Sequence, residues 1–505
     1  MKRIVLLVGV LSGVAFACRA APAGEIGADV QAVLADKVLA KAKVGIDVVR
    51  LGDSPATSTA VYQLHPHDPL TPASNLKVVT TSAALDKLGA DFKFRTLLVR
   101  HGRDLVLIGD GDPAIGDAEE LRKLNMDCTT VFATWAAGLA KAGLTDFDNL
   151  YVDDSVFEQQ FIHPRWPADQ QEKRYEAGVG GLNLNANCLD VFVHAGTPGQ
   201  VVQFTTDPPT AYVTVRNTCV TGSENAVWLS RQIGGNTIIL RGQTRQTIDV
   251  PVSVTIQDPP MFTGTVLAET LRAGGVTLHG SVSRDRTLRA AYLARTTGID
   301  KTWSLLAVNE TSLLTVIARA NKDSMNLYAE CVCKRLGFAA TGEGSWASGT
   351  SAVGTFLRGL GVGAEEFNLD DGCGLSKQDS VSPTAMVAVL AHDYFSNYSK
   401  AYLSTLSVAG SDGTLQDRFK DSDLRGRVIG KSGFVNGVSC LSGFLTGRDG
   451  RAYVFSILIN GIPDLSNSLV KVLEEKVVHA VDIDCTLPRI AGTVSSTDAM
   501  SPARK

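Results

Sequence analysis

The chain has 505 residues, of which 44% are hydrophobic and 20% charged, and its formal net charge at pH 7 is −4. A chain of this length exceeds one ordinary hydrophobic core, so we expect a globular protein of several domains. The small net charge provides no basic surface for nucleic acid and no acidic tail, and nucleic acid is therefore excluded as a partner.

The N-terminal segment is typical of a secretory signal peptide. A basic start is followed by an apolar run over residues 4–17 and then by small residues. We predict a signal peptide over residues 1–23 and an exported protein of the periplasm or cell envelope. Cleavage after Ala17 is an alternative that would place Cys18 first, where a lipid anchor would be the single membrane contact. Past residue 24 no apolar run approaches the ~20 residues that cross a bilayer.

The first of three short motifs is Ser74-Asn75-Leu76-Lys77. Pro72 leads the chain to a helix start, and the apolar spacing that begins at Leu76 predicts a helix packed inward, with Ser74 in its first turn. A serine hydroxyl is a poor nucleophile at neutral pH, and a partly desolvated lysine one helical turn away can take its proton. The pattern therefore indicates acyl transfer, and the alternative is a capping serine beside a solvated lysine.

A second sequence, Ser468-Leu469-Val470-Lys471, has the same spacing. It lies inside a predicted C-terminal helix with apolar residues at helical spacing. A pattern this short occurs by chance in a chain of this length. We therefore expect Ser468 to be a surface or first-turn residue without a catalytic role.

A long stretch separates the first motif from the second, Ser324-Met325-Asn326, and is larger than one fold needs between two catalytic groups. Residues 92–290 carry short β-like runs broken by Gly, Asp and Pro, which predicts an inserted, mostly β region of two small domains. The β-like runs cover residues 94–99, 105–108, 201–205, 211–215, 237–240 and 247–256. Residues 304–337 and 380–395 are predicted to be helical.

The third motif, Lys431-Ser432-Gly433, begins a predicted β-hairpin. Its strand meets the next one across Asn436-Gly437, a pair suited to a type I′ turn, and a further strand continues the antiparallel meander. On such an edge an extended peptide could dock as an added strand, with Gly433 allowing close approach. The alternative for Lys431 is an ordinary edge lysine that discourages aggregation.

Cysteine and histidine spacings indicate no metal site and no cofactor. Eight of the nine cysteines remain if cleavage follows Ala23, and the sequence does not choose among their pairings. Cys331 and Cys333 would lie about 200° apart on one helix, which disfavours a direct disulfide. The segment from His65 to Asp68 is predicted to be a loop, and residues 486–505 are predicted to be a disordered tail.

With these motifs in this order, the chain resembles the class C low-molecular-mass penicillin-binding proteins, D-alanyl-D-alanine carboxypeptidases/endopeptidases related to serine β-lactamases. The resemblance covers residues 25–485. It includes, beyond the motifs, Gly109–Pro113, Asp258-Pro259, Gly274-Gly275, Gly280, Asn321-Lys322, Ala329-Glu330, Asp371–Ser376 and Gly410–Leu415. It implies an α+β multi-domain fold: a transpeptidase-like domain of residues 25–91 and 291–485, with an antiparallel sheet flanked by helices, interrupted by the insert.

The resemblance also implies residue roles. Ser74 would attack the carbonyl between two D-alanines of a peptidoglycan stem peptide, with Lys77 as general base. Ser324 and Lys431 would relay a proton to the departing D-alanine, and Asn326 would hold the substrate amide and orient Lys77. The remaining implied substrate-binding positions are Ser432 and Gly433, with Lys431 and Ser432 attracting the terminal carboxylate, and the backbone N–H groups of Ser74 and Phe434 as the oxyanion hole. β-Lactam antibiotics would be covalent inhibitors.

Four residues depart from the family pattern: Met325 replaces an aspartate, Cys373 a serine, Ser432 a threonine, and Phe434 a threonine or serine. Phe434 removes a hydroxyl that could contact the substrate carboxylate. Two alternatives therefore stay open. One is a β-lactamase on the same scaffold, for which we assign no deacylating base, and the other is a non-enzymatic peptidoglycan-binding protein with a degenerate site.

Overall fold

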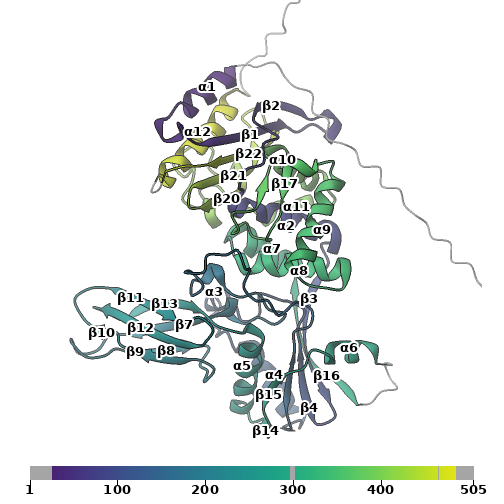
Figure 1. Ribbon diagram of the computed structural model, residues 1–505, viewed down its shortest axis with the longest axis vertical. Helices are drawn as coiled ribbons and strands as arrows, with labels where there is room; N and C mark the ends of the chain where they lie inside the picture. The colour runs from purple at the N-terminus through teal and green to yellow at the C-terminus, as the bar shows by residue number, and fades with distance from the viewer. Residues whose placement is uncertain (1–24, 296–301, 464–465, 485–505) are drawn as a thin grey trace, which may run out of the picture.

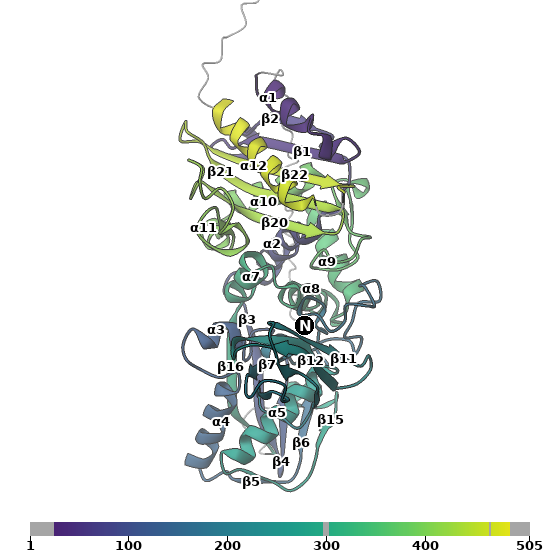
Figure 2. The same cartoon turned by 90° about the vertical axis from the view of Figure 1, so that its left-hand side faces the viewer.

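The computed structural model describes residues 25–295, 302–463 and 466–484. The molecule is elongated, with one part at the top built from both ends of the chain and a second part below it (Figures 1 and 2). The predicted signal peptide, Cys18 and the predicted tail lie outside the described residues.

A six-stranded antiparallel sheet with the order β19-β20-β21-β22-β1-β2 forms the centre of the upper part. Its strands are β1 (Lys43–Arg50), β2 (Thr59–Leu64), β19 (Ser407–Val408), β20 (Val428–Val435), β21 (Val438–Thr446) and β22 (Ala452–Asn460). The N-terminal β1 pairs along its whole length with β22, from Lys43 opposite Asn460 to Arg50 opposite Tyr453. This confirms the expected sheet, in which N-terminal strands and the C-terminal meander combine.

Helices cover both faces of this sheet. The helices on one face are α1 (Glu25–Leu34) and α12 (Asn467–Asp484), which contact each other. The helices on the other side are α2 (Leu76–Leu88), α7 (Leu313–Lys322), α8 (Asn326–Thr341), α9 (Trp346–Gly359), α10 (Pro383–Phe395) and α11 (Ser399–Ser404). Strands β21 and β22 are therefore buried on both faces, and β22 reads as a nearly continuous apolar run.

The lower part contains a five-stranded mixed sheet with the order β15-β6-β4-β3-β16. Its strands are β3 (Lys93–His101), β4 (Asp104–Ile108), β6 (Leu150–Asp153), β15 (Val282–Arg284) and β16 (Trp303–Ser312). The helices of this part are α3 (Ala118–Arg122), α4 (Thr130–Lys141), α5 (Pro259–Ala273) and α6 (Leu288–Ala294), and β5 (Asp146–Phe147) pairs with β14 (Thr277–Leu278). Phe132 of α4 and Phe262 of α5 pack together in the core of this part.

Strand β16 corrects two predictions. Residues 304–312 were predicted to be helical, and the insert was predicted to end at residue 290, but β16 pairs with β3 from Trp303 opposite His101 to Ser312 opposite Lys93. The apolar residues here are too few to separate a helical from a strand period. Helix α7 begins only at Leu313, where the Ser312 side chain accepts a hydrogen bond from Thr315 N and caps it.

A β lobe of residues 188–255 projects from the lower part (Figure 1). One sheet contains β7 (Cys188–His194), β8 (Gln203–Asp207) and β13 (Ile248–Thr255). The other contains β9 (Thr214–Asn217), β10 (Val220–Thr221), β11 (Ala226–Arg231) and β12 (Thr237–Thr244). Val191, Leu240 and Val254 belong to one buried cluster that joins the two sheets.

The predicted hairpin is confirmed in register, with Val435 opposite Val438 and Lys431 opposite Ser442. Its turn is not type I′, because Gly437 has a φ of 84° while Asn436 is outside the positive region that this turn requires at both positions. The seven cysteines within the described ranges are free and buried: Cys128, Cys188, Cys219, Cys331, Cys333, Cys373 and Cys440. No helix in those ranges is long and apolar enough to cross a membrane.

Candidate active site

Ser74 lies in a single 3-10 turn, Ala73–Asn75, that runs directly into α2. It therefore precedes the α-helix. The sequence predicts Ser74 in the first turn of that helix, so the observed position differs by a few residues. Ala73 has a φ of 46°, a left-handed conformation that is costly for a residue with a side chain and that occurs most often at functional sites. Lys77, three residues later, places Nζ 2.9 Å from Ser74 Oγ.

Lys77 has two further partners besides Ser74. Its Nζ lies 2.7 Å from Oδ1 of Asn326 and 2.9 Å from the carbonyl oxygen of Cys373. A neutral amine has two N–H groups and one lone pair, so the two carbonyl oxygens occupy both N–H groups and leave the lone pair for the Ser74 hydroxyl. This arrangement matches what a general base needs.

Burial favours the neutral form of that amine. The Lys77 side chain is 0% exposed, and loss of hydration lowers its pKa below the ordinary lysine value. The acidic groups of Cys373, Asp371 and Glu330 oppose part of this shift. The net direction is toward a lysine that can accept a proton closer to neutral pH.

The second motif lies between α7 and α8. Ser324 has a left-handed φ of 58°, and Asn326 is the first residue of α8. Met325, between them, packs against the hydrophobic core, while the flanking side chains reach the site. The Asn326 amide also donates to the carbonyl of Tyr175, 2.8 Å away, in the 3-10 turn Arg174–Glu176 of the insert.

The third motif brings a second buried lysine to the site. Lys431 on β20 has Nζ 2.9 Å from Ser324 Oγ and donates to the Ser432 carbonyl over 2.8 Å. Burial, followed by repulsion from the nearby charge of Lys77, holds the Lys431 pKa well below its usual range. The structure thus places the three motifs, far apart in sequence, around one centre.

Gly433 lets strand β20 lie directly against the turn that carries Ser74. A Cβ atom at this position would sit 2.7 Å from the Pro72 carbonyl oxygen, 3.0 Å from Asn75 N and 3.2 Å from Ser74 N. Its neighbours differ in exposure: Ser432 is partly buried, and the Phe434 side chain is 52% exposed.

The turn is also tied to the middle of the sheet. Asn75 Nδ2 donates to Ser442 Oγ over 2.7 Å, and Ser442 contacts Ser456 over 2.9 Å. Asn75, and the carbonyl groups of Tyr175 and Cys373, are parts of the site to which sequence reasoning assigned no role. Backbone groups carry no residue signature, although the loop around Cys373 was already part of the family resemblance.

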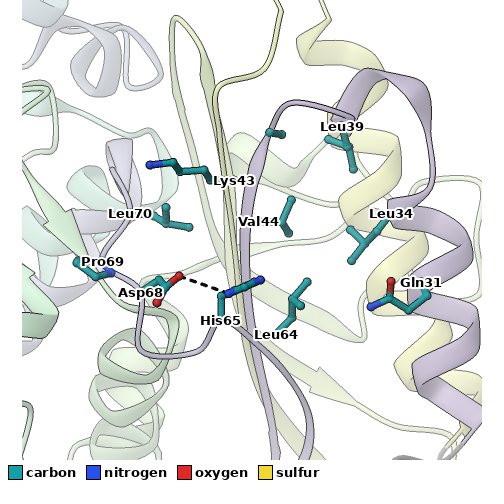
Figure 3. A pocket seen from close by; sticks show the side chains of 11 residues that line it. Gln31, Leu34, Leu39, Lys43, Val44, Leu64, His65, Asp68, Pro69 and Leu70 are labelled. Atoms are coloured by element: carbon teal, nitrogen blue, oxygen red, sulfur yellow. Dashed lines mark ion pairs between the residues drawn. The ribbon is translucent and has the colours of Figure 1, made fainter.

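A sizeable cavity of the described residues lies away from the three motifs. About 640 Å³ open between α1 and the segment from β2 to Leu70, where His65 and Asp68 face each other 3.4 Å apart (Figure 3). None of the three motifs lines it. The site is therefore identified by the convergence of its side chains rather than by cavity size.

Comparisons with known proteins agree with this arrangement. The model of the D-Ala-D-Ala carboxypeptidase 3 (S13) family matches residues 26–480. A D-alanyl-D-alanine carboxypeptidase of Actinomadura sp. (strain R39) is 30% identical over 465 residues, 86% of this chain and 81% of that protein. D-alanyl-D-alanine carboxypeptidase DacB of Haemophilus influenzae is 25% identical, over 77% of this chain and 80% of that protein.

The fold has a solved counterpart in penicillin binding protein 4 from Haemophilus influenzae. The two superpose with a TM-score of 0.72 at 22% identity, covering 90% of this chain and 99% of the other. This likeness shows a shared architecture, and the sequence matches show a shared family. The chain belongs to the D-Ala-D-Ala carboxypeptidase 3 (S13) family and is a serine-type peptidase.

Proposed function

We propose that the protein cleaves D-Ala-D-Ala bonds of peptidoglycan stem peptides through an acyl-enzyme on Ser74. One observation carries the proposal: the buried Lys77 amine is 2.9 Å from Ser74 Oγ while carbonyl oxygens of Asn326 and Cys373 occupy its other directions. A lysine in this geometry can take the proton of the serine hydroxyl. A solvated surface lysine lacks the fixed partners that direct its lone pair.

In the acylation step, neutral Lys77 takes the Ser74 proton as Oγ attacks the carbonyl between the two D-alanines. The developing oxyanion is held by the backbone N–H groups of Ser74 and Phe434. The close approach of Gly433 to Ser74 N supports this pairing, because it places β20 beside the turn without an intervening side chain.

In the second half of the step, the bond to the departing D-alanine breaks and its nitrogen needs a proton. Ser324 supplies it and is recharged by Lys431, whose Nζ is 2.9 Å from Ser324 Oγ. Lys431 and Ser432 also attract the substrate carboxylate. That anion offsets the burial and the repulsion that lower the Lys431 pKa, so docking favours the charged form of Lys431. Asn326 fixes the substrate amide, and water then hydrolyses the acyl-enzyme.

We further propose that the chain is exported and works in the periplasm or cell envelope, where its substrate lies. The sequence of residues 1–23 and the bacterial cell-wall relatives support this. A β-lactam complex has been solved for the Haemophilus influenzae protein, at a TM-score of 0.67 to this chain, which supports β-lactams as covalent inhibitors. Fractionation of cells expressing the wild type and Cys18→Ser would distinguish release from lipid anchoring.

Digestion of purified muropeptides, read by mass, tests the proposal. Release of D-alanine from pentapeptides or cleavage of cross-linked dimers is expected, and the ratio of the two separates carboxypeptidase from endopeptidase activity. Rapid turnover of nitrocefin would instead indicate a β-lactamase. Muropeptide binding with no product, in a protein that also fails to react with penicillin, would indicate a non-enzymatic binding protein and overturn the proposal.

A further inference from the structure

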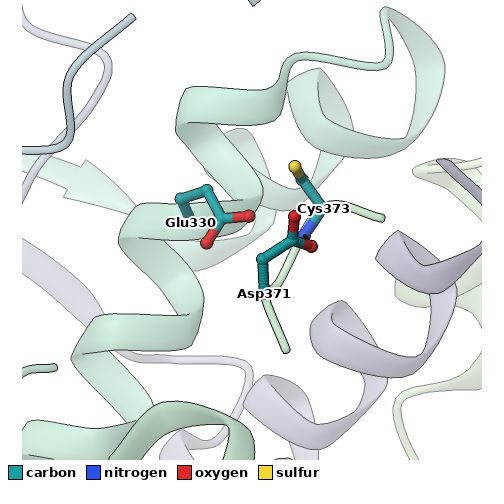
Figure 4. Close-up of side chains that lie close together, drawn as sticks. All are labelled: Glu330, Asp371 and Cys373. Atoms are coloured by element: carbon teal, nitrogen blue, oxygen red, sulfur yellow. Dashed lines mark hydrogen bonds between the residues drawn. The ribbon is translucent and has the colours of Figure 1, made fainter. Parts of the chain in front are cut away.

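A buried acidic cluster lies behind Lys77. Figure 4 shows Glu330 on α8 facing Asp371 and Cys373 on the neighbouring loop. All three are buried, and their oxygen and sulfur atoms lie within 4.8 Å of one another. The acidic side chains of this cluster accept hydrogen bonds from N–H groups of the protein. The cluster therefore holds neighbouring segments of the chain in place.

Glu330 holds one peptide group in particular. Its oxygens accept the Gly372 N–H at 2.9 and 3.1 Å, and one of them also accepts the Trp346 Nε1–H at 2.6 Å. The Cys373 thiol interacts with the same carboxyl group. Two N–H groups and the thiol therefore converge on the two oxygens of Glu330, which keep lone pairs in both the neutral and the ionised form.

The same loop segment is fixed from its other sides. Thr80 on α2 donates to the Gly372 carbonyl over 2.7 Å, and Asp371 accepts the N–H of Cys373 over 2.9 Å. The Cys373 carbonyl of this segment is the acceptor for Lys77. Position 372 has to be glycine for this fit, since a Cβ there would lie 2.5 Å from Cys333 Cβ.

We propose that Glu330 is a positioning residue for the general base: by holding the Gly372 N–H, it fixes the Cys373 carbonyl that aims the Lys77 lone pair at Ser74. Glu330 touches neither the substrate nor Ser74 and acts through the loop. The inference rests on the proposed role of Lys77 and extends it to a residue to which the catalytic motifs assign nothing.

The charge state of Glu330 also affects the protonation of Lys77. Burial, followed by repulsion from Asp371, raises its pKa to about 8, so it is mostly neutral at pH 7. A neutral Glu330 keeps one negative charge away from Lys77 and spares the amine from being held in its protonated form. The titratable groups that face Glu330 are Asp371 and Cys373 on the loop, Lys77 on α2, and Cys331, Cys333 and Lys334 on its own helix.

The test uses Glu330→Gln in the full-length protein and measures the rate of acylation by penicillin from pH 5 to 10. Both oxygens of a carboxyl group carry accepting lone pairs, whereas the nitrogen of an amide only donates, so the Gly372 peptide loosens and water reaches Lys77. We expect acylation about tenfold slower at pH 7, because misplacement of a catalytic group costs rate steeply. The acid limb of the profile should move to higher pH, since a better hydrated lysine has a higher pKa.

Asp393→Asn is the matched control. Asp393 is an equally buried carboxyl group with a pKa raised to about 7 by burial, and it contacts Ser82 on α2 but not the 371–376 loop. We expect this variant to lose thermal stability yet keep the wild-type acylation rate and pH midpoint. A purely structural role for buried carboxyl groups would make both variants behave alike.

A second variant, Thr80→Val, tests the same inference if Glu330→Gln does not fold. It removes a different side-chain hydrogen bond to the same segment, so slower acylation with the same shift of the acid limb is expected. Wild-type rate and pH midpoint in Thr80→Val, or in folded Glu330→Gln, would overturn the inference. Failure of the proposed function has a different signature, because the wild-type protein itself would then not be acylated.

Discussion

Two Ser-x-x-Lys sequences in this chain share residue types and spacing but lie in opposite surroundings. At Ser74, the lysine is wholly buried and bonded to the serine and to two fixed carbonyl oxygens. At Ser468, the serine is exposed in the first turn of α12, and Lys471 lies on the surface side of a helix held by Val470 and Leu473. The ability of the lysine to act as a general base therefore depends on its burial and on fixed hydrogen-bond acceptors. The Ser-x-x-Lys spacing alone provides neither of these.

The largest expected effect separates the two serines. Ser74→Ala should abolish covalent labelling by a fluorescent penicillin and reduce D-alanine release on the order of 10⁴-fold. The reason is that the variant lacks the hydroxyl from which Lys77 takes a proton. Ser468→Ala is the control and should label like the wild type. Labelling that persists in Ser74→Ala and disappears in Ser468→Ala would reverse the comparison.

The two lysines should differ almost as strongly. Lys77→Gln removes the base while keeping a side chain of similar length, and we expect acylation to slow by about 10²–10⁴-fold, the usual contribution of general-base catalysis. Lys471→Gln should leave the rate unchanged. The measurement is the second-order rate of penicillin acylation, with circular dichroism confirming that both variants are folded.

Packing around the first motif can be tested at Gly433. Gly433→Ala adds a Cβ 2.7 Å from the Pro72 carbonyl oxygen, so β20 must move away from the turn of Ser74. We expect acylation up to about 10²-fold slower, as for a displacement near 1 Å in an active site. Gly359→Ala is matched, because no atom lies within 4 Å of its added Cβ. Equal rates in the two variants would show that the close approach is unimportant.

The pH dependence sharpens the role of desolvation. Lys77 works as a base only when deprotonated, and burial lowers its pKa below the ordinary 10.5. The acylation rate should therefore fall about tenfold per pH unit below the Lys77 pKa, and this limb should lie below the ordinary lysine value. Measuring kcat/KM for D-alanine release across pH 5–10 checks this. A limb at the ordinary lysine value would mean that Lys77 is solvated.

The smallest expected effect concerns Phe434, which is exposed beside Ser432 on β20. Phe434→Thr supplies a hydroxyl at the place where the substrate carboxylate is proposed to bind. We expect KM for a D-Ala-D-Ala peptide to fall several-fold with kcat nearly unchanged, because a hydrogen bond at an exposed position contributes about 0.5–1.5 kcal/mol net. Phe434→Val removes the ring without adding a hydroxyl, so an equal fall in KM there would assign the effect to ring size.

The sheet flanked by helices was implied by the family resemblance. The sequence predicted several helices and the register of the Lys431 hairpin, because these depend on side-chain periodicity and turn residues that can be read locally. It also gave the residues that surround Lys77, apart from the Cys373 carbonyl. It failed at β16, where a short apolar run fits a helix as well as a strand until its pairing with β3 is known. The Tyr175 and Cys373 carbonyls could not be found because any residue carries such a group.

The pairing of β1 with β22 has a consequence for biosynthesis. Residues 428–460 contain both the strand that carries Lys431 and the strand that pairs with β1. The ribosome therefore makes Ser74 and Lys77 early and Lys431 late. A ribosome-bound chain that already contains Ser74 lacks its second ammonium group and the strand beside the nucleophile. The hydrolase is thus silent until almost the whole polypeptide has emerged, and C-terminal truncation through β20 should yield an inert product.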